Sequence, residues 1–213
     1  MTQPQLKLTY FDFKGRAELT RLIFHYGVVP FTDDRLARAD FPALKPTLPF
    51  GQVPALEVNG TSYAQSMAIA RYAAKLSGLY PSDPVKALKV DMFSCSLGEL
   101  AEAFIELAEA FIGIVLKTQD ADEKAQKQKL FVDETAPKFF TALEKLVEGK
   151  FILGDQISYA DIHLLDLVDN GIKWGIPSFT LEAYPKLAAV IATVTADPKI
   201  AEYIAGASKV GLV

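Results

Sequence analysis

One segment, residues 50–66, constrains the fold of the N-terminal part more than any other. Pro54 has no N–H to donate, so it fits the start or edge of a strand and leaves the backbone of Val53 free to pair with something else. Asn59-Gly60 stands between two short β-forming runs and predicts a tight hairpin, because both residues tolerate positive φ. Ser66 is predicted to cap a helix whose free N–H groups can hold a carboxylate. We therefore expect a peptide-binding sheet edge beside a helix N-terminus.

The residues before and after this hairpin predict a small mixed sheet with helices packed on it. Apolar and polar residues alternate over 6–10, as in a strand, and an apolar stripe at helical spacing then predicts a helix between Gly15 and Gly27. The remaining elements expected here are a strand over 31–36, a loop containing Pro42, Pro46 and Pro49, the hairpin itself, and a helix over 66–77 that Gly78 stops.

Residues 79–84 read as a linker, and everything after them looks helical. Two long amphipathic segments over 85–117 and 121–148 precede three shorter helices. Ser158 and Asp161 have the spacing of a capping box, with Ile157 and Ile162 placed for a hydrophobic staple. We interpret this motif as a folding device and not as a catalytic site.

Composition narrows the function classes. The chain has 213 residues, 50% of them hydrophobic, and a net charge of −4, which predicts a folded protein without a nucleic-acid or anionic-membrane partner. No secretory signal or membrane span is expected, so a cytoplasmic location is predicted. The single cysteine, Cys95, excludes an intramolecular disulfide and is expected to be a small buried hydrophobe. His25 and His163 are isolated in sequence, so no metal site is expected.

Several motifs together resemble the cytosolic glutathione transferases, most closely the sigma class, over essentially the whole chain. They are Leu6–Phe11, Gly15–Glu18, Leu48–Pro54, Gln65–Tyr72 and Ser158–Asp161. The resemblance implies an α/β plus all-α fold: a thioredoxin-like domain over 1–81, with a mixed four-stranded sheet, followed by an all-helical domain over 84–213. The pattern of elements gives the same division independently.

The resemblance also implies how glutathione, a peptide with one thiol and two carboxylates, is held. The Val53 backbone, before a cis Pro54, would pair with the cysteinyl unit like an added strand. Gln65 and Ser66 would hold the γ-glutamyl carboxylate, and Lys45 and Gln52 the glycyl carboxylate. Gly51 and Phe41 complete the expected site; Phe41 stands where the sigma class commonly has tryptophan, so it keeps an apolar wall and lacks an indole N–H donor. Glu99 aligns with a carboxylate that reaches the γ-glutamyl amine of the other subunit.

Tyr10 is the residue expected to activate the thiol. A free thiol titrates near ~8.5, and each ~1.4 kcal/mol of differential stabilisation of the thiolate lowers that pKa by about one unit. A tyrosine hydroxyl donating to sulfur supplies such stabilisation, and Arg16 adds a favourable field. Glutathione serves as co-substrate and no cofactor is expected. The electrophile pocket should draw on Phe11, Arg16, residues 101–106 and the C-terminal tail.

The expected function is conjugation of glutathione to small hydrophobic electrophiles by a homodimer in which Phe50 is a candidate contact. The alternatives are a weakly active glutathione-binding or crystallin-like structural protein, and a glutathione-dependent isomerase or peroxidase. A thiol–disulfide oxidoreductase is disfavoured because no cysteine follows the first strand. Without the resemblance, Tyr10 could be a packing residue, Gln65-Ser66 a plain helix cap, Lys45 a solvated loop lysine, and Arg16 the partner of Glu18 or another surface acid.

Overall fold

The structure, a computed structural model, describes residues 3–117 and 121–207, and within these the side chains of 106–124 and of 207 are left aside. The chain packs as two compact units, one made of residues 1–81 and 195–213 and the other of residues 82–194. The expected domain boundaries, 1–81 and 84–213, stay a prediction.

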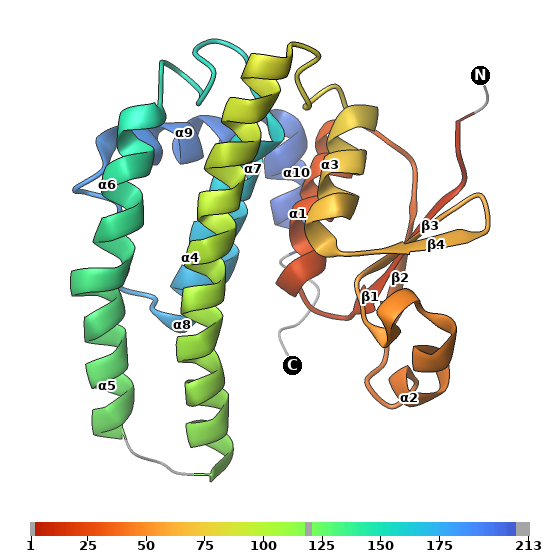
Figure 1. Cartoon of the computed structure of the whole chain (residues 1–213), viewed down its shortest axis with the longest axis horizontal. Coiled ribbons are helices and arrows are strands. Elements are labelled where there is room, and N and C mark those ends of the chain that lie inside the picture. Colours follow the sequence, from red (N-terminus) through yellow and green to blue (C-terminus); the bar gives the residue numbers. More distant parts are fainter. Residues whose placement is uncertain (1–2, 118–120, 208–213) are drawn as a thin grey trace. The chain divides into compact units, whose positions relative to one another are not determined.

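The first unit is built on a four-stranded mixed sheet, as predicted (Figure 1). Its strands are β1 (Leu6–Phe11), β2 (Thr32–Leu36), β3 (Ala55–Val58) and β4 (Thr61–Ala64). The strand order is β2-β1-β3-β4; β1 runs parallel to β2 and antiparallel to β3, and β3 runs antiparallel to β4. The parallel strands β1 and β2 belong to the βαβ unit, and the antiparallel strands β3 and β4 form the predicted hairpin.

The hairpin turn has the predicted geometry. Asn59 and Gly60 both have positive φ, 50° and 85°, and Val58 pairs with Thr61 across the two-residue turn. The β3 register begins at Ala55, so the Val53–Pro54 peptide precedes the paired part of the strand. That peptide bond is cis, as the resemblance implied.

The longer described helices of this unit are α1 (Glu18–Tyr26), α3 (Ser66–Leu76) and α10 (Pro198–Ala207). A 3-10 turn over Gly15–Ala17 leads into α1, which packs against both α3 and α10. In Figure 1, α1 and α3 lie side by side against the sheet. The predicted apolar stripe of α1 is buried at Leu19, Leu22 and Ile23. Gly27 caps its end, as expected.

The predicted loop over 37–49 is wrong, because this segment is largely helical. It contains α2 (Phe41–Leu44) and two 3-10 turns, Lys45–Thr47 and Pro49–Gly51. Each of the three begins with a proline at its first or second position, where the missing N–H would have no helical partner and the fixed φ suits the turn. The three prolines therefore start short helical turns and do not keep the segment irregular.

The second unit is helical, as predicted. Its helices are α4 (Pro84–Lys117), α5 (Ala121–Leu130), α6 (Ala136–Leu146), α7 (Tyr159–Leu165), α8 (Lys173–Gly175) and α9 (Pro185–Thr195). A π-helical turn over Phe131–Thr135 joins α5 to α6, and another over Asp166–Ile172 joins α7 to α8. Among the described residues, no helix is both long and apolar enough to cross a membrane.

The capping box at the start of α7 is present and fully buried. Asp161 Oδ2 accepts from the backbone N–H and the hydroxyl of Ser158, each over 2.8 Å. Asp161 Oδ1 accepts from the N–H of Ile152, also over 2.8 Å. The motif thus fixes the loop before α7 as well as the helix start, which agrees with a role in folding.

Candidate active site

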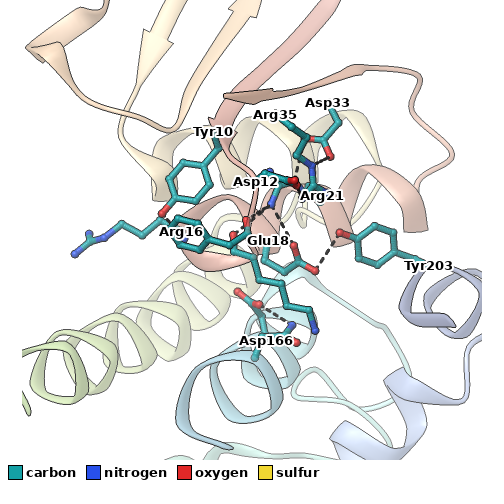
Figure 2. A network of polar contacts seen from close by, with 12 residues as sticks. Tyr10, Asp12, Arg16, Glu18, Arg21, Asp33, Arg35, Asp166 and Tyr203 are labelled. Atoms are coloured by element: carbon teal, nitrogen blue, oxygen red, sulfur yellow. Dashed lines mark hydrogen bonds and ion pairs between the residues drawn. The ribbon is translucent and has the colours of Figure 1, made fainter. Parts of the chain in front are cut away.

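Tyr10 lies at the end of β1 with a buried ring, 6% exposed. Its hydroxyl oxygen accepts a hydrogen bond from the backbone N–H of Arg16 over 3.3 Å (Figure 2). The intervening turn needs glycine: Gly15 has φ +47°, and a Cβ there would lie 2.6 Å from the Tyr10 hydroxyl oxygen and 2.5 Å from the Phe13 ring. The turn therefore closes directly over the hydroxyl.

The surroundings of Tyr10 keep its phenol protonated. Burial raises the pKa of Tyr10 above 10.0, while the Arg16 N–H bond and the charges of Arg16, Arg21 and Arg38 act in the opposite direction. Because the Arg16 N–H already occupies one oxygen lone pair, the hydroxyl proton is available for an acceptor. At neutral pH this group is a hydrogen-bond donor, and the turn holds its oxygen.

Aromatic rings pack around the Tyr10 ring. The Tyr10 ring centroid lies 5.6 Å from that of Phe11 and 5.2 Å from that of Phe13. Phe41 packs its ring edge-on against Phe11, with the centroids 5.4 Å apart. Phe41 therefore belongs to the aromatic cluster beside Tyr10, and its role as a wall of the glutathione site stays a prediction.

The sheet register brings the other expected site residues to the same end as Tyr10. Thr9 pairs with Ala55, and Ala55 pairs with Ala64. The next position along each strand is Tyr10, Pro54 and Gln65 respectively, so these three residues come together at one end of three neighbouring strands. The expected catalytic hydroxyl, the cis peptide and the start of α3 therefore form one candidate site.

The start of α3 differs from the prediction by one residue. Gln65, with φ 74°, occupies the N-cap position, and Ser66 is the first helical residue, so Ser66 is not the cap. The reason is backbone geometry: the Gln65 carbonyl accepts from the N–H groups of Ala68 and Ile69 over 2.9 and 3.0 Å. The N–H groups of the first helical residues have no intrahelical acceptor and can receive an anion.

Lys45 and Gly51 lie against each other on the helical segment between β2 and β3. Lys45 is exposed, and a Cβ at Gly51 would lie 3.3 Å from both Cγ and Cε of that lysine. Gly51 has φ +59°, so a side chain there would be strained as well. The exposed Gln52 follows directly. An ammonium and an amide thus stand at neighbouring positions, ahead of the half-buried Val53.

Other expected residues lie elsewhere or stay untested. Glu99 is exposed on α4 in the second compact unit, and its assignment to the site stays a prediction. Of the expected electrophile pocket, the Glu106 side chain and residues 208–213 lie outside the described part. Glu18 forms an ion pair with Arg21. Sequence reasoning missed Arg21; its only signal was a charged residue three positions after Glu18 on a largely apolar helix.

The predictions for Cys95 and for the two histidines have different outcomes. The prediction that Cys95 is buried is wrong, since it is exposed on α4. His25 stacks on Tyr203 with ring centroids 4.4 Å apart, and His163 Nδ1 lies 2.7 Å from the Ser94 hydroxyl. Among the described side chains, no three His, Cys, Asp or Glu residues gather as metal ligands would.

Comparison with known proteins agrees with this geometry. The family model described as glutathione S-transferase, N-terminal domain, matches residues 6–75, and the model for the C-terminal domain matches residues 105–207. Glutathione S-transferase 1 of Ascaris suum is 37% identical, over 95% of this chain and 96% of its own length. The chain belongs to the glutathione S-transferase family of enzymes.

Further similarities of this glutathione S-transferase point to the sigma class. Hematopoietic prostaglandin D synthase of Gallus gallus is 36% identical, over 94% of this chain and 96% of its own length. The solved structure of the Fasciola hepatica sigma class enzyme matches with a TM-score of 0.82 and 26% identity, over 98% of this chain and 99% of that one. The transferase is therefore sigma-class-like.

Proposed function

We propose that this transferase conjugates glutathione to small hydrophobic electrophiles, with Tyr10 donating a hydrogen bond to the sulfur. The observation that carries the proposal is the Arg16 N–H on the Tyr10 oxygen, which leaves the hydroxyl proton for an anionic acceptor. A donor fixed in advance and aimed at a thiolate stabilises the anion relative to the thiol, so more of the bound glutathione is reactive at neutral pH. The Arg16 charge adds to this effect. Attack on the electrophilic carbon then needs only orientation.

The proposed binding mode follows the end of the sheet. The backbone of Val53, before the cis Pro54, pairs with the cysteinyl unit. Gln65 and Ser66 hold the γ-glutamyl carboxylate at the start of α3. The remaining proposed contacts, toward the glycyl end, are Phe41, Lys45, Gly51 and Gln52. Residues 1–81 thus form the glutathione domain, and residues 84–213 contribute the electrophile pocket.

The proposal is tested with a chromogenic aryl halide. We expect Tyr10→Phe to lower kcat/KM by about 10- to 100-fold at neutral pH, because the donor to sulfur is lost. Tyr63→Phe is the matched control: the same atom is removed from an exposed tyrosine on β4, and activity should not change. Absence of glutathione-dependent turnover in the wild type, or a Tyr10→Phe variant as fast as wild type, would contradict the proposal.

The Gallus gallus relative, by its name a prostaglandin D synthase, favours a glutathione-dependent isomerase as the second candidate. An isomerase returns the thiol at the end of each cycle, so turnover consumes no glutathione. Product analysis with a prostaglandin endoperoxide separates the two reactions. Glutathione binding by calorimetry with neither reaction would favour a crystallin-like structural role.

We also propose that the enzyme is a cytoplasmic homodimer. Exposed apolar side chains on α4 support a self-contact: Val85 is 74% exposed, Leu88 69% and Met92 47%. Glu99 continues the same helical line, where it would meet the partner copy. Phe50, 76% exposed in the first unit, is a second candidate contact.

A further inference from the structure

We infer that Arg21 is a positioning residue for the catalytic hydroxyl: it holds the turn from which the Arg16 N–H reaches Tyr10. This inference rests on the proposed role of Tyr10. Arg21 lies on α1 and its side chain is fully buried. It contacts the backbone of the turn on one side and two carboxylates on the other, all within the first compact unit.

The contact with the turn is direct. Arg21 NH1 donates to the carbonyl oxygens of Phe13 and Lys14, over 2.9 and 3.2 Å. These two carbonyls immediately precede Gly15, where the chain turns back over the Tyr10 hydroxyl. The next N–H after Gly15 is that of Arg16, which donates to the Tyr10 oxygen. One nitrogen of Arg21 therefore fixes the segment that sets the position of the donor to Tyr10.

Arg21 also lies against the ring of the same tyrosine. Its guanidinium carbon is 5.9 Å from the Tyr10 ring centroid. A guanidinium at this distance from a tyrosine ring is attracted by the ring electrons. Arg21 thus holds the turn that precedes Arg16 on one side and lies against the Tyr10 ring on the other.

Acidic residues fix the orientation of the guanidinium. Arg21 Nε lies 3.0 Å from Asp33 Oδ1 on β2, and NH1 lies 3.3 Å from Glu18 Oε2. Glu18 Oε1 accepts from the Tyr203 hydroxyl on α10 over 3.0 Å. Figure 2 shows these groups joined around Arg21, with the Arg16 side chain pointing away from it. The arrangement links β2 and α10 to the catalytic turn through one cation.

Stability alone does not explain an arginine at this position. Arg21 NH2 is buried without a hydrogen-bond partner, and an unpaired buried donor destabilises a fold. What arginine provides is a planar fork that donates to the turn and to Asp33 at once, which a lysine ammonium cannot do in this geometry. The side chain is thus suited to placing the turn.

The test compares Arg21→Lys with Arg38→Lys. Both variants keep the charge, and Arg38 also lies near the turn, 5.9 Å from the Phe13 ring centroid, without holding the carbonyls. The readouts are the pH profile of kcat/KM and the pKa of bound glutathione, followed by thiolate absorbance. For Arg21→Lys we expect kcat/KM below the thiol pKa to fall about tenfold and that pKa to rise by about one unit, with the KM for glutathione changed less than about twofold. Arg38→Lys should match the wild type.

A thiol pKa and pH profile for Arg21→Lys equal to those of wild type would overturn the inference, even if the variant melts earlier. If Arg21→Lys does not fold, the same measurements on Asp33→Asn test the inference, because this substitution weakens the ion pair that orients Arg21. Asp34→Asn is its control: the carboxylate of the neighbouring residue accepts from the Thr9 hydroxyl over 2.9 Å. Equal thiol pKa values in these two variants would then overturn the inference. If the wild type shows no turnover, the proposed function is contradicted. The thiolate absorbance of bound glutathione still tests whether Arg21 affects the thiol pKa.

Discussion

The backbone N–H of Arg16 lies 3.3 Å from the hydroxyl oxygen of Tyr10, six residues earlier in the chain. A turn that closes within six residues brings a main-chain donor onto a side chain at the strand end. The backbone donor binds the phenol oxygen, and the O–H group can still donate to an acceptor. The role proposed for Tyr10 therefore depends on a turn as well as on the tyrosine.

Gly15→Ala tests that turn. We expect kcat/KM to fall by about tenfold or more, because the new methyl group would displace the Tyr10 hydroxyl or the Phe13 ring, and small displacements of reacting groups are costly. Gly60→Ala is the control: its φ of +85° is equally unsuited to alanine, yet nothing lies within 4 Å of the added atom. Steady-state kinetics and thermal melting check both. Equal activities in the two variants would contradict a role for the turn.

Tyr203 gives a pH-dependent prediction for stability. Burial, and then the neighbouring Glu18 carboxylate, raise the pKa of Tyr203 above its ordinary value of 10.0. Because the pKa is higher in the folded than in the unfolded state, the protonated Tyr203 hydroxyl stabilises the fold fully below pH 10. This stabilisation is lost as the pH rises through the folded-state pKa. We expect wild type to exceed Tyr203→Phe in free energy of unfolding at pH 8, by a margin that shrinks above about pH 10. Urea titrations at several pH values check this, and a margin that grows with pH would contradict it.

The features that the sequence predicted well are local. The Asn59-Gly60 hairpin and the Ser158–Asp161 capping box each depend on residues within a few positions, and both are present in the structure. The alternating pattern over 6–10 also predicted β1, which runs one residue further, to Phe11. Backbone preference and burial act in the same direction at these places, so a short sequence is enough.

The features that were missed depend on distant partners. A charged residue on α1 is expected to be exposed, and the partners of Arg21 on β2 and in the turn come from positions that its own helix does not show. Cys95 was expected in the core, yet it lies on the exposed line of α4. The N-cap moved from Ser66 to Gln65 because positive φ at a glutamine has no signal in the sequence.

Asp161→Asn should weaken folding without changing glutathione binding. The variant replaces one of two acceptor oxygens by an amide, which leaves buried N–H or hydroxyl donors of Ser158 or Ile152 unpaired. We expect the free energy of unfolding to fall by about 2–4 kcal/mol. Asp155→Asn, at an exposed position in the same unit, should cost little. Urea unfolding measures the stability, and calorimetric titration with glutathione measures the affinity. A weaker affinity at temperatures well below the melting temperature of the variant would mean that the motif does more than support the fold.

The last prediction concerns a line of exposed side chains along α4. Val85, Leu88, Met92 and Cys95 are spaced three and four residues apart, so they share one face of the helix. If a second copy covers this face, wild type should sediment at twice the 23.3 kDa chain mass. Met92→Glu should then shift the mass toward the single chain, because a carboxylate would be buried unpaired in the interface.

Lys86→Glu is the control, since this exposed side chain lies off the line while the substitution introduces the same carboxylate side chain. Sedimentation equilibrium at several concentrations distinguishes the three proteins. If Glu99 acts across the interface, Met92→Glu should also bind glutathione more weakly than Lys86→Glu does, because each copy then lacks the carboxylate of its partner. A monomeric wild type would contradict the dimer. A monomeric Met92→Glu variant with wild-type affinity would instead show that each copy binds glutathione without Glu99 of the other.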